Sequence, residues 1–226
     1  VRALKMHGGR SKSELAQEDP QAVQRGLPNL MRHVDNLGEV FGVPCVVAVN
    51  RFPTDTEAEL RVVEDACRAR GVPVARSEAW AHGGAGAEAL AQEVVRLCGT
   101  PSSFRFCYEL TGSVEERIET IVRRVHHGAG VRLTPAARKQ IAQLSENGFG
   151  ALPVCMAKTQ YSFSDDPSLL GAPEDFFVTV RAVRVNAGAG FLVALTGDIM
   201  TMPGLPKSPA AERIDVDADG RISGLF

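Results

Sequence analysis

The feature that most constrains the fold is a regular alternation of apolar strands and amphipathic helices along residues 1–100. Residues 43–49 read Val-Pro-Cys-Val-Val-Ala-Val and are apolar on both faces, which is typical of a buried parallel strand. Thr56 and Glu59 form a capping box at the start of the next apolar helical stripe. The predicted elements are a strand at 2–6, a helix at 27–41, a strand at 43–49, a helix from Thr56 to Gly71, a strand at 72–75 and a helix at 86–98. This order predicts a parallel sheet with helices on both faces.

The pattern changes after residue 100. The elements predicted there are a strand at 104–110, a helix capped by Ser113 and Glu116, a helix starting at Thr134-Pro135, strands at 152–157, 176–185 and 190–196, and a hairpin about Asp219-Gly220. We therefore predict an α/β domain at 1–100, a small two-layer α+β domain at 101–160 and a mainly β domain at 161–226.

Composition and charge exclude several classes of protein. The longest apolar runs have about seven residues, whereas a membrane-spanning helix needs roughly 20. The net charge of −2 provides no overall positive field for nucleic acid or anionic lipid. The five cysteines lie among apolar neighbours and form no C-x-x-C pair, which predicts a reducing compartment, the cytoplasm, and no zinc site.

Two ligand-binding patterns are weak. The run Asp215-x-Asp217-x-Asp219-Gly220 starts like a calcium loop, but its twelfth position is Phe226 instead of Glu, so we expect a hairpin and no metal site. Gly84-x-Gly86-x-x-Ala89 resembles a dinucleotide fingerprint, but residues 77–83 separate it from the preceding strand. A dinucleotide-binding domain is therefore the least favoured alternative. The Walker A and H-E-x-x-H patterns do not occur in the sequence.

Two large aromatic residues follow neighbouring strands. Phe52 comes after the strand at 43–49, and Trp80 comes after the strand at 72–75. Ligands of open parallel sheets bind at the carboxyl ends of the strands, so these two rings could clamp a flat heteroaromatic ring between them. The alternative is that both rings pack into the core, as most Trp and Phe side chains do.

These aromatics belong to stretches that follow one another in a fixed order. The stretches are Val1 to Gly9 (VRALKMHGG), Asn50 to Thr56 (NRFPTDT), Trp80 to Gly86 (WAHGGAG), Leu152 to Ser162 (LPVCMAKTQYS), Thr201 to Pro206 (TMPGLP) and the ending Ile222 to Phe226 (ISGLF). In this order they resemble the formate–tetrahydrofolate ligase family, also called formyltetrahydrofolate synthetase, over essentially the whole chain.

The resemblance implies ATP-dependent ligation of formate to N10 of tetrahydrofolate through formyl phosphate. It implies that Phe52 and Trp80 flank the pterin ring and that Asn50, Pro53, Gly83 and Gly84 shape the same pocket. It further implies that Pro203, Gly204, Leu205 and Pro206 lie near the nucleotide. The implied small molecules are formate, tetrahydrofolate and ATP, with Mg²⁺ and a monovalent cation beside them, and the full-length enzyme is expected to be a homo-oligomer.

The sequence also departs from the family. His82 stands where Lys or Gln is frequent, and Ala85 stands where a charged residue is frequent. The family's phosphate-binding loop with its Lys, and the Arg that holds formyl phosphate, have no counterpart here. Because the chain starts at Val1 inside a predicted strand, we expect the carboxyl-terminal portion of a P-loop NTPase-like enzyme, without ligase turnover of its own. A non-catalytic folate-binding or interaction domain is the alternative.

Overall fold

The computed structural model describes residues 1–157, 162–197 and 206–224, and its first half confirms the predicted α/β alternation. The elements are α1 (Arg2–His7), α2 (Pro20–Asp35), β1 (Val47–Asn50), α3 (Glu57–Ala69), β2 (Val74–Ser77), α4 (Ala79–His82) and α5 (Glu88–Cys98). β1 and β2 pair in parallel, with Asn50 opposite Ser77 at their carboxyl ends. Helices α1, α2 and α3 pack in sequence against one another, and α5 packs against β2.

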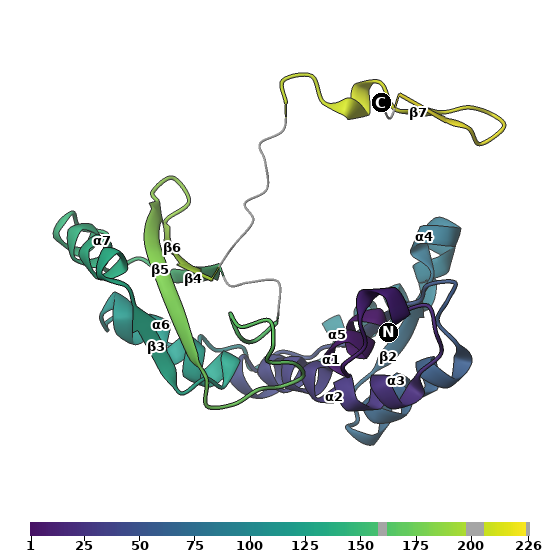
Figure 1. The fold of residues 1–226 in the computed structure, drawn as a ribbon, viewed down its shortest axis with the longest axis horizontal. Coiled ribbons are helices and arrows are strands. Elements are labelled where there is room, and N and C mark those ends of the chain that lie inside the picture. Colours follow the sequence, from purple (N-terminus) through teal and green to yellow (C-terminus); the bar gives the residue numbers. More distant parts are fainter. Residues whose placement is uncertain (158–161, 198–205, 225–226) are drawn as a thin grey trace.

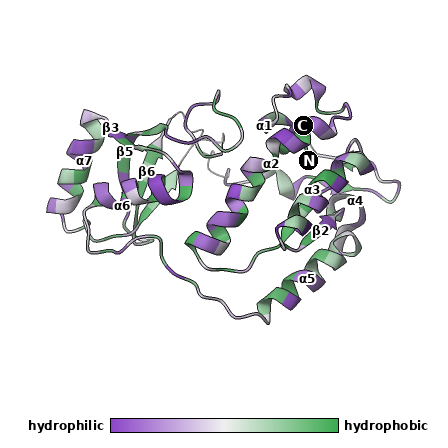
Figure 2. Ribbon diagram, turned by 90° about the horizontal axis from the view of Figure 1, so that it is seen from below, coloured by the Kyte–Doolittle hydropathy of each residue, from purple (hydrophilic) through white to green (hydrophobic). Residues whose placement is uncertain are grey.

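The second unit is a four-stranded mixed sheet with two helices. Its elements are α6 (Val114–Ile121), β3 (Gly130–Leu133), α7 (Pro135–Glu146), β4 (Val154–Ala157), β5 (Phe177–Asn186) and β6 (Phe191–Thr196). The strand order is β3-β5-β6-β4, in which β5 and β6 are antiparallel and both outer pairs are parallel. The sheet therefore joins strands from the predicted regions 101–160 and 161–226. Figure 2 shows hydrophobic residues along β5 and β6, and their inward side chains share a core with Ile118 and Ile141.

Helix α2 links the two units, which lie to either side of it in Figure 1. Its carboxyl end continues into a π-helical turn, Asn36–Val40, and the Asn36 side chain donates to the carbonyl of Val125 at 2.8 Å. The predicted hairpin is confirmed: β7 (Asp215–Val216) and β8 (Ile222–Ser223) pair antiparallel, apart from both units in Figure 1. Within the described residues, no helix combines the length and the apolar character needed to cross a membrane.

Two predicted strands are wrong. Residues 2–6 form helix α1, because Arg, Ala, Leu, Lys and Met all favour helices and the Lys5 N–H donates to the Val1 carbonyl. Residues 104–110 form no strand. Instead, the N–H groups of Ser103 and Arg105 donate to carbonyls at the end of the helical turn that follows α2, so this segment pairs with a loop.

A buried ion pair holds the first unit together. The Lys5 ammonium lies 2.5 Å from Glu59 Oε1, and both side chains are fully buried. Lys5 Nζ also donates to the carbonyls of Leu15 and Gln17, at 2.9 and 2.7 Å. Glu59 accepts from the N–H of Asp19 at 2.7 Å and closes the capping box of α3. Each charged group is also hydrogen-bonded. The pair therefore joins three parts of the unit: helix α1, the segment that precedes α2, and helix α3.

Glycines allow α1 and α2 to cross closely. A Cβ on Gly8 would lie 1.9 Å from the Ala22 carbonyl oxygen, and one on Gly26 would lie 2.0 Å from that of Leu4. Any side chain at either position would therefore force the two helices apart. This close contact between the backbones explains why positions 8 and 26 are both glycine.

Removing one partner of the Lys5–Glu59 pair should destabilise the protein strongly. Lys5→Met leaves the Glu59 carboxylate buried without its cation, and we expect the free energy of unfolding in urea to fall by about 3–5 kcal/mol. The double variant Lys5→Met/Glu59→Leu should lose less, because it leaves no uncompensated charge.

The exposed pair between Arg123 and Glu119 provides the control. Glu119→Gln should change stability by less than about 1 kcal/mol. A Lys5→Met variant that is as stable as Glu119→Gln would show that the buried pair does not hold this unit together.

Acid should unfold the protein through the same pair. Burial alone would raise the pKa of Glu59, but hydrogen bonds from Lys5 and from the N–H groups of Asp19 and Thr56 outweigh it and hold the pKa below the ordinary value of 4.5. The carboxylate therefore contributes stability above that value, and the contribution is lost as pH falls through the lowered pKa. Urea midpoints measured from neutral pH to about pH 3 should fall more steeply for wild type than for Glu59→Gln.

Candidate functional site

The structure brings the Phe52 and Trp80 loops together. Because β1 and β2 are parallel, both loops leave the same edge of the sheet. Trp80 lies in the short helix α4, and its indole Nε1 donates to the carbonyl of Arg51 at 2.9 Å. The Trp80 side chain is 60% exposed and Phe52 is half-buried. This hydrogen bond thus ties the Trp80 side chain to the residue that directly precedes Phe52, and both rings keep accessible surface.

A tight turn sets the position of Phe52. The Phe52 N–H donates to Asp55 Oδ2 at 2.9 Å, and the Asp55 N–H donates back to the Phe52 carbonyl at 2.9 Å. Asp55 is buried, and its other oxygen has no hydrogen-bond partner among the described residues. Pro53 lies exposed at the tip of the turn, which leads into the Thr56 cap of α3. The start of α3 therefore fixes the backbone that carries the ring.

An ion-pair network connects the two loops through Arg51. Its guanidinium lies 3.2 Å from Glu78, just before α4, and 3.4 Å from Glu57 of α3. Arg76 pairs with Glu57 at 2.9 Å and with Glu64 at 2.5 Å. The hydrogen bond from Arg76 lowers the pKa of Glu57, and the bonds to Glu64 and Glu57 raise the pKa of Arg76. Sequence reasoning did not select Arg51, although it directly precedes Phe52.

The glycines after Trp80 are explained by the backbone of the loop that carries them. The Glu78 N–H donates to the Gly86 carbonyl at 2.8 Å, and a Cβ on Gly86 would lie 2.5 Å from the Glu78 carbonyl oxygen. Gly83 adopts a φ of 57°, and Gly84 is exposed with open space around its Cβ position. Packing against Glu78 explains Gly86 without a dinucleotide. His82 and Ala85 are both exposed on the same loop.

A cavity of about 450 Å³ begins beside Phe52. Its walls are the first turn of α1, the α2 residues Asn29 and His33, and β1 as far as Asn50. At the α2 wall, Asn29 Nδ2 donates to Ser162 Oγ at 2.7 Å, and His33 Nε2 lies 3.1 Å from the same hydroxyl. The cavity is thus lined by the predicted substrate residues Asn50 and Phe52, and its α2 wall contacts Ser162, the last residue of the Leu152–Ser162 stretch.

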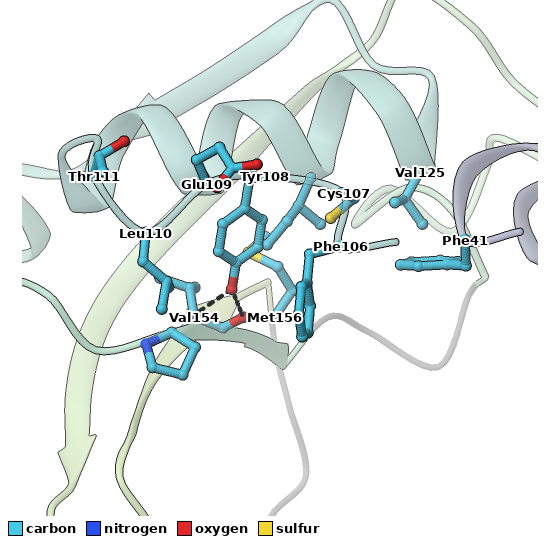
Figure 3. A pocket seen from close by; sticks show the side chains of 12 residues that line it. Phe41, Phe106, Cys107, Tyr108, Glu109, Leu110, Thr111, Val125, Val154 and Met156 are labelled. Atoms are coloured by element: carbon cyan, nitrogen blue, oxygen red, sulfur yellow. Dashed lines mark hydrogen bonds between the residues drawn. The ribbon is translucent and has the colours of Figure 1, made fainter. Parts of the chain in front are cut away.

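A larger cavity, of about 730 Å³, lies in the second unit (Figure 3). Phe41, Phe106 and Met156 give it an apolar lining. The Tyr108 hydroxyl accepts from the Val154 N–H at 2.9 Å and donates to the Val154 carbonyl at 3.2 Å, as the dashed lines show. Val154 begins the outer strand β4, so this phenol occupies the N–H and C=O groups of the strand's first residue. Among the described residues, none of those predicted to bind substrate lines this cavity.

The residues predicted to lie near the nucleotide are mostly outside the described part of the chain. Pro203, Gly204 and Leu205 lie outside the described residues, and Pro206 is exposed. Among residues 1–157, 162–197 and 206–224, no group of three or more His, Cys, Asp or Glu side chains could hold a metal ion.

The Arg51 network should restrict the motion of Trp80, which is the one tryptophan of the sequence. In Arg51→Gln both ion pairs are lost, so we expect lower Trp fluorescence anisotropy and stronger acrylamide quenching. Global stability should change by less than about 1 kcal/mol, because both pairs are partly exposed.

Arg76→Gln is the matched control, because Arg76 pairs with Glu57 and Glu64 but not with Glu78. It should leave the anisotropy near that of wild type. Equal anisotropy in wild type and Arg51→Gln would show that the network does not hold the Trp80 loop.

A comparison with protein-family models identifies the family of the chain. The model of the formate–tetrahydrofolate ligase family matches residues 1–226, the whole chain. The stretches that carry Phe52 and Trp80, which the fold places at one sheet edge, fall within that match. The chain therefore belongs to the formate–tetrahydrofolate ligase family.

Proposed function

We propose that this chain takes part in the ATP-dependent ligation of formate to tetrahydrofolate, and that the Phe52 and Trp80 rings hold the pterin. The observation that carries the proposal is the hydrogen bond from Trp80 Nε1 to the Arg51 carbonyl, which joins the two aromatic loops at the carboxyl edge of a parallel sheet. This edge is where open α/β sheets bind their ligands. Family membership supplies the substrates, formate, ATP and tetrahydrofolate.

The proposed reaction has two steps. A formate oxygen attacks the γ-phosphorus of ATP, which gives formyl phosphate and ADP. The N10 amine of tetrahydrofolate then attacks the formyl carbon, phosphate leaves with the bonding electrons of the C–O bond, and N10 loses its proton. Activation is needed because the formate carboxylate is resonance-stabilised and has no leaving group.

In this reaction the described residues would bind and orient the folate. The rings of Phe52 and Trp80 provide apolar faces for offset stacking, and their fixed loops reduce the entropy lost on binding. The Arg51 bridge to Glu78 maintains the spacing of the loops. Asn50, which is exposed and lines the 450 Å³ cavity, offers an amide donor and acceptor to the polar edge of the pterin. Pro53, Gly83 and Gly84 complete the rim.

The phosphate chemistry has no matching motif in the 226 residues, because G-x-x-x-x-G-K-[ST] does not occur. We therefore assign this chain to the folate end of the reaction. Within the proposal, the residues 203–206 remain the candidates for nucleotide contact, and the parallel sheet remains a candidate part of a P-loop NTPase-like domain.

Trp80→Ala tests the folate site. Loss of stacking and of buried area should weaken tetrahydrofolate binding by about 1–3 kcal/mol, or roughly 5- to 150-fold in Kd, measured by isothermal titration calorimetry. Tryptophan fluorescence of the wild type should be quenched by the same ligand, because Trp80 is the single tryptophan of the sequence.

Phe106→Ala is the control, since Phe106 is an exposed aromatic at the other cavity. It should bind tetrahydrofolate as wild type does. Binding that is unchanged in Trp80→Ala, or equally weakened in Phe106→Ala, would contradict the proposed site.

A further inference from the structure

Arg2 is an unpaired cation stacked on the predicted pterin-binding ring. Its guanidinium carbon lies 3.6 Å from the centroid of the Phe52 ring, and the residue is exposed. Among the described residues, no carboxylate or other acceptor forms an ion pair or hydrogen bond with it. Arg10, Arg51 and Arg76, which belong to the same unit, all have carboxylate partners.

Stacking leaves the donor groups of Arg2 available. A guanidinium that lies over an aromatic face is held by cation–π attraction, while its N–H groups point outward at its own edge. Guanidinium is weakly hydrated and binds carboxylate or phosphate oxygens in a bidentate manner. A stacked guanidinium without a protein partner is therefore prepared to bind an oxyanion.

The surroundings of Arg2 favour such a ligand. Arg2 lines the 450 Å³ cavity together with Asn50 and Phe52. The nearby Lys5 is neutralised by Glu59, and the Asp55 carboxylate is buried and accepts from the Phe52 N–H. Because Arg2 covers one face of the Phe52 ring, the proposed contact with a flat ring would use the other face.

We propose that Arg2 forms an oxyanion-binding subsite beside Phe52, which takes a carboxylate or phosphate oxygen of a substrate. The inference rests on the proposed function, which supplies two sources of this chemistry. One is the glutamyl tail of tetrahydrofolate, and the other is the phosphoryl group of ATP or formyl phosphate. In either case Arg2 binds an anionic group of the substrate close to the pterin ring that stacks on Phe52.

Calorimetric titration of the full chain with three probes tests the subsite. The probes are tetrahydrofolate, 6-methyltetrahydropterin, which lacks the glutamyl carboxylates, and inorganic phosphate. If the anion is the glutamyl carboxylate, Arg2→Gln should weaken tetrahydrofolate binding about tenfold and leave the pterin unchanged. If the anion is a phosphoryl group, Arg2→Gln should weaken only phosphate binding. Arg2→Lys should restore part of either loss.

Arg61→Gln is the matched control, because Arg61 is an exposed arginine on α3 and the charge change is the same. It should bind all three probes as wild type does. The subsite is disproved if Arg2→Gln also matches wild type for all three, or if it weakens tetrahydrofolate and the pterin equally, since Arg2 would then only support Phe52. A wild type that binds phosphate but neither folate nor pterin would instead refute the proposed function and leave the subsite standing.

Discussion

The buried pair of Lys5 and Glu59 is the interaction on which the first unit depends. It joins a six-residue helix, an irregular segment and the start of α3, none of which would be stable alone. Apolar residues of similar volume could fill the same space, but they would not select this arrangement, because hydrophobic contact has no direction. The hydrogen bonds to the Leu15 and Gln17 carbonyls and to the Asp19 N–H define one register of the chain.

The same pair determines the geometry of the candidate site. Lys5 holds helix α1, whose first residue is Arg2, and Glu59 completes the cap of α3, whose preceding turn carries Phe52. The guanidinium and the ring that it covers are therefore placed by two ends of one ion pair. Trp80 is positioned separately, through the Arg51 carbonyl and the Arg51–Glu78 ion pair. The Lys5–Glu59 pair thus both stabilises the interior of the first unit and positions Arg2 and Phe52 at its surface.

Local signals in the sequence predicted much of the fold. The capping boxes at Thr56 and Ser113 and the Thr134-Pro135 start all begin helices, because they depend on residues only three positions apart. Residues 2–6 were assigned by hydropathy, although their helix propensity pointed the other way. The order β3-β5-β6-β4 could not be derived, since it depends on contacts between distant segments. The positions of Phe52 and Trp80 directly after strands are visible in the sequence. Arg2 lies over a ring face, and Arg51 accepts a hydrogen bond through its backbone carbonyl, and neither contact produces a sequence pattern.

The hydroxyl of Tyr108 affects whether the outer strand β4 can pair with a strand of another molecule. An outer strand with free N–H and C=O groups can pair with the same strand of another molecule, and such edge-to-edge pairing is a route to aggregation. Tyr108 occupies both backbone groups of Val154 at the start of β4, which opposes pairing with a foreign strand at that residue. A strand that approached this edge would have to displace the phenol before it could pair with Val154.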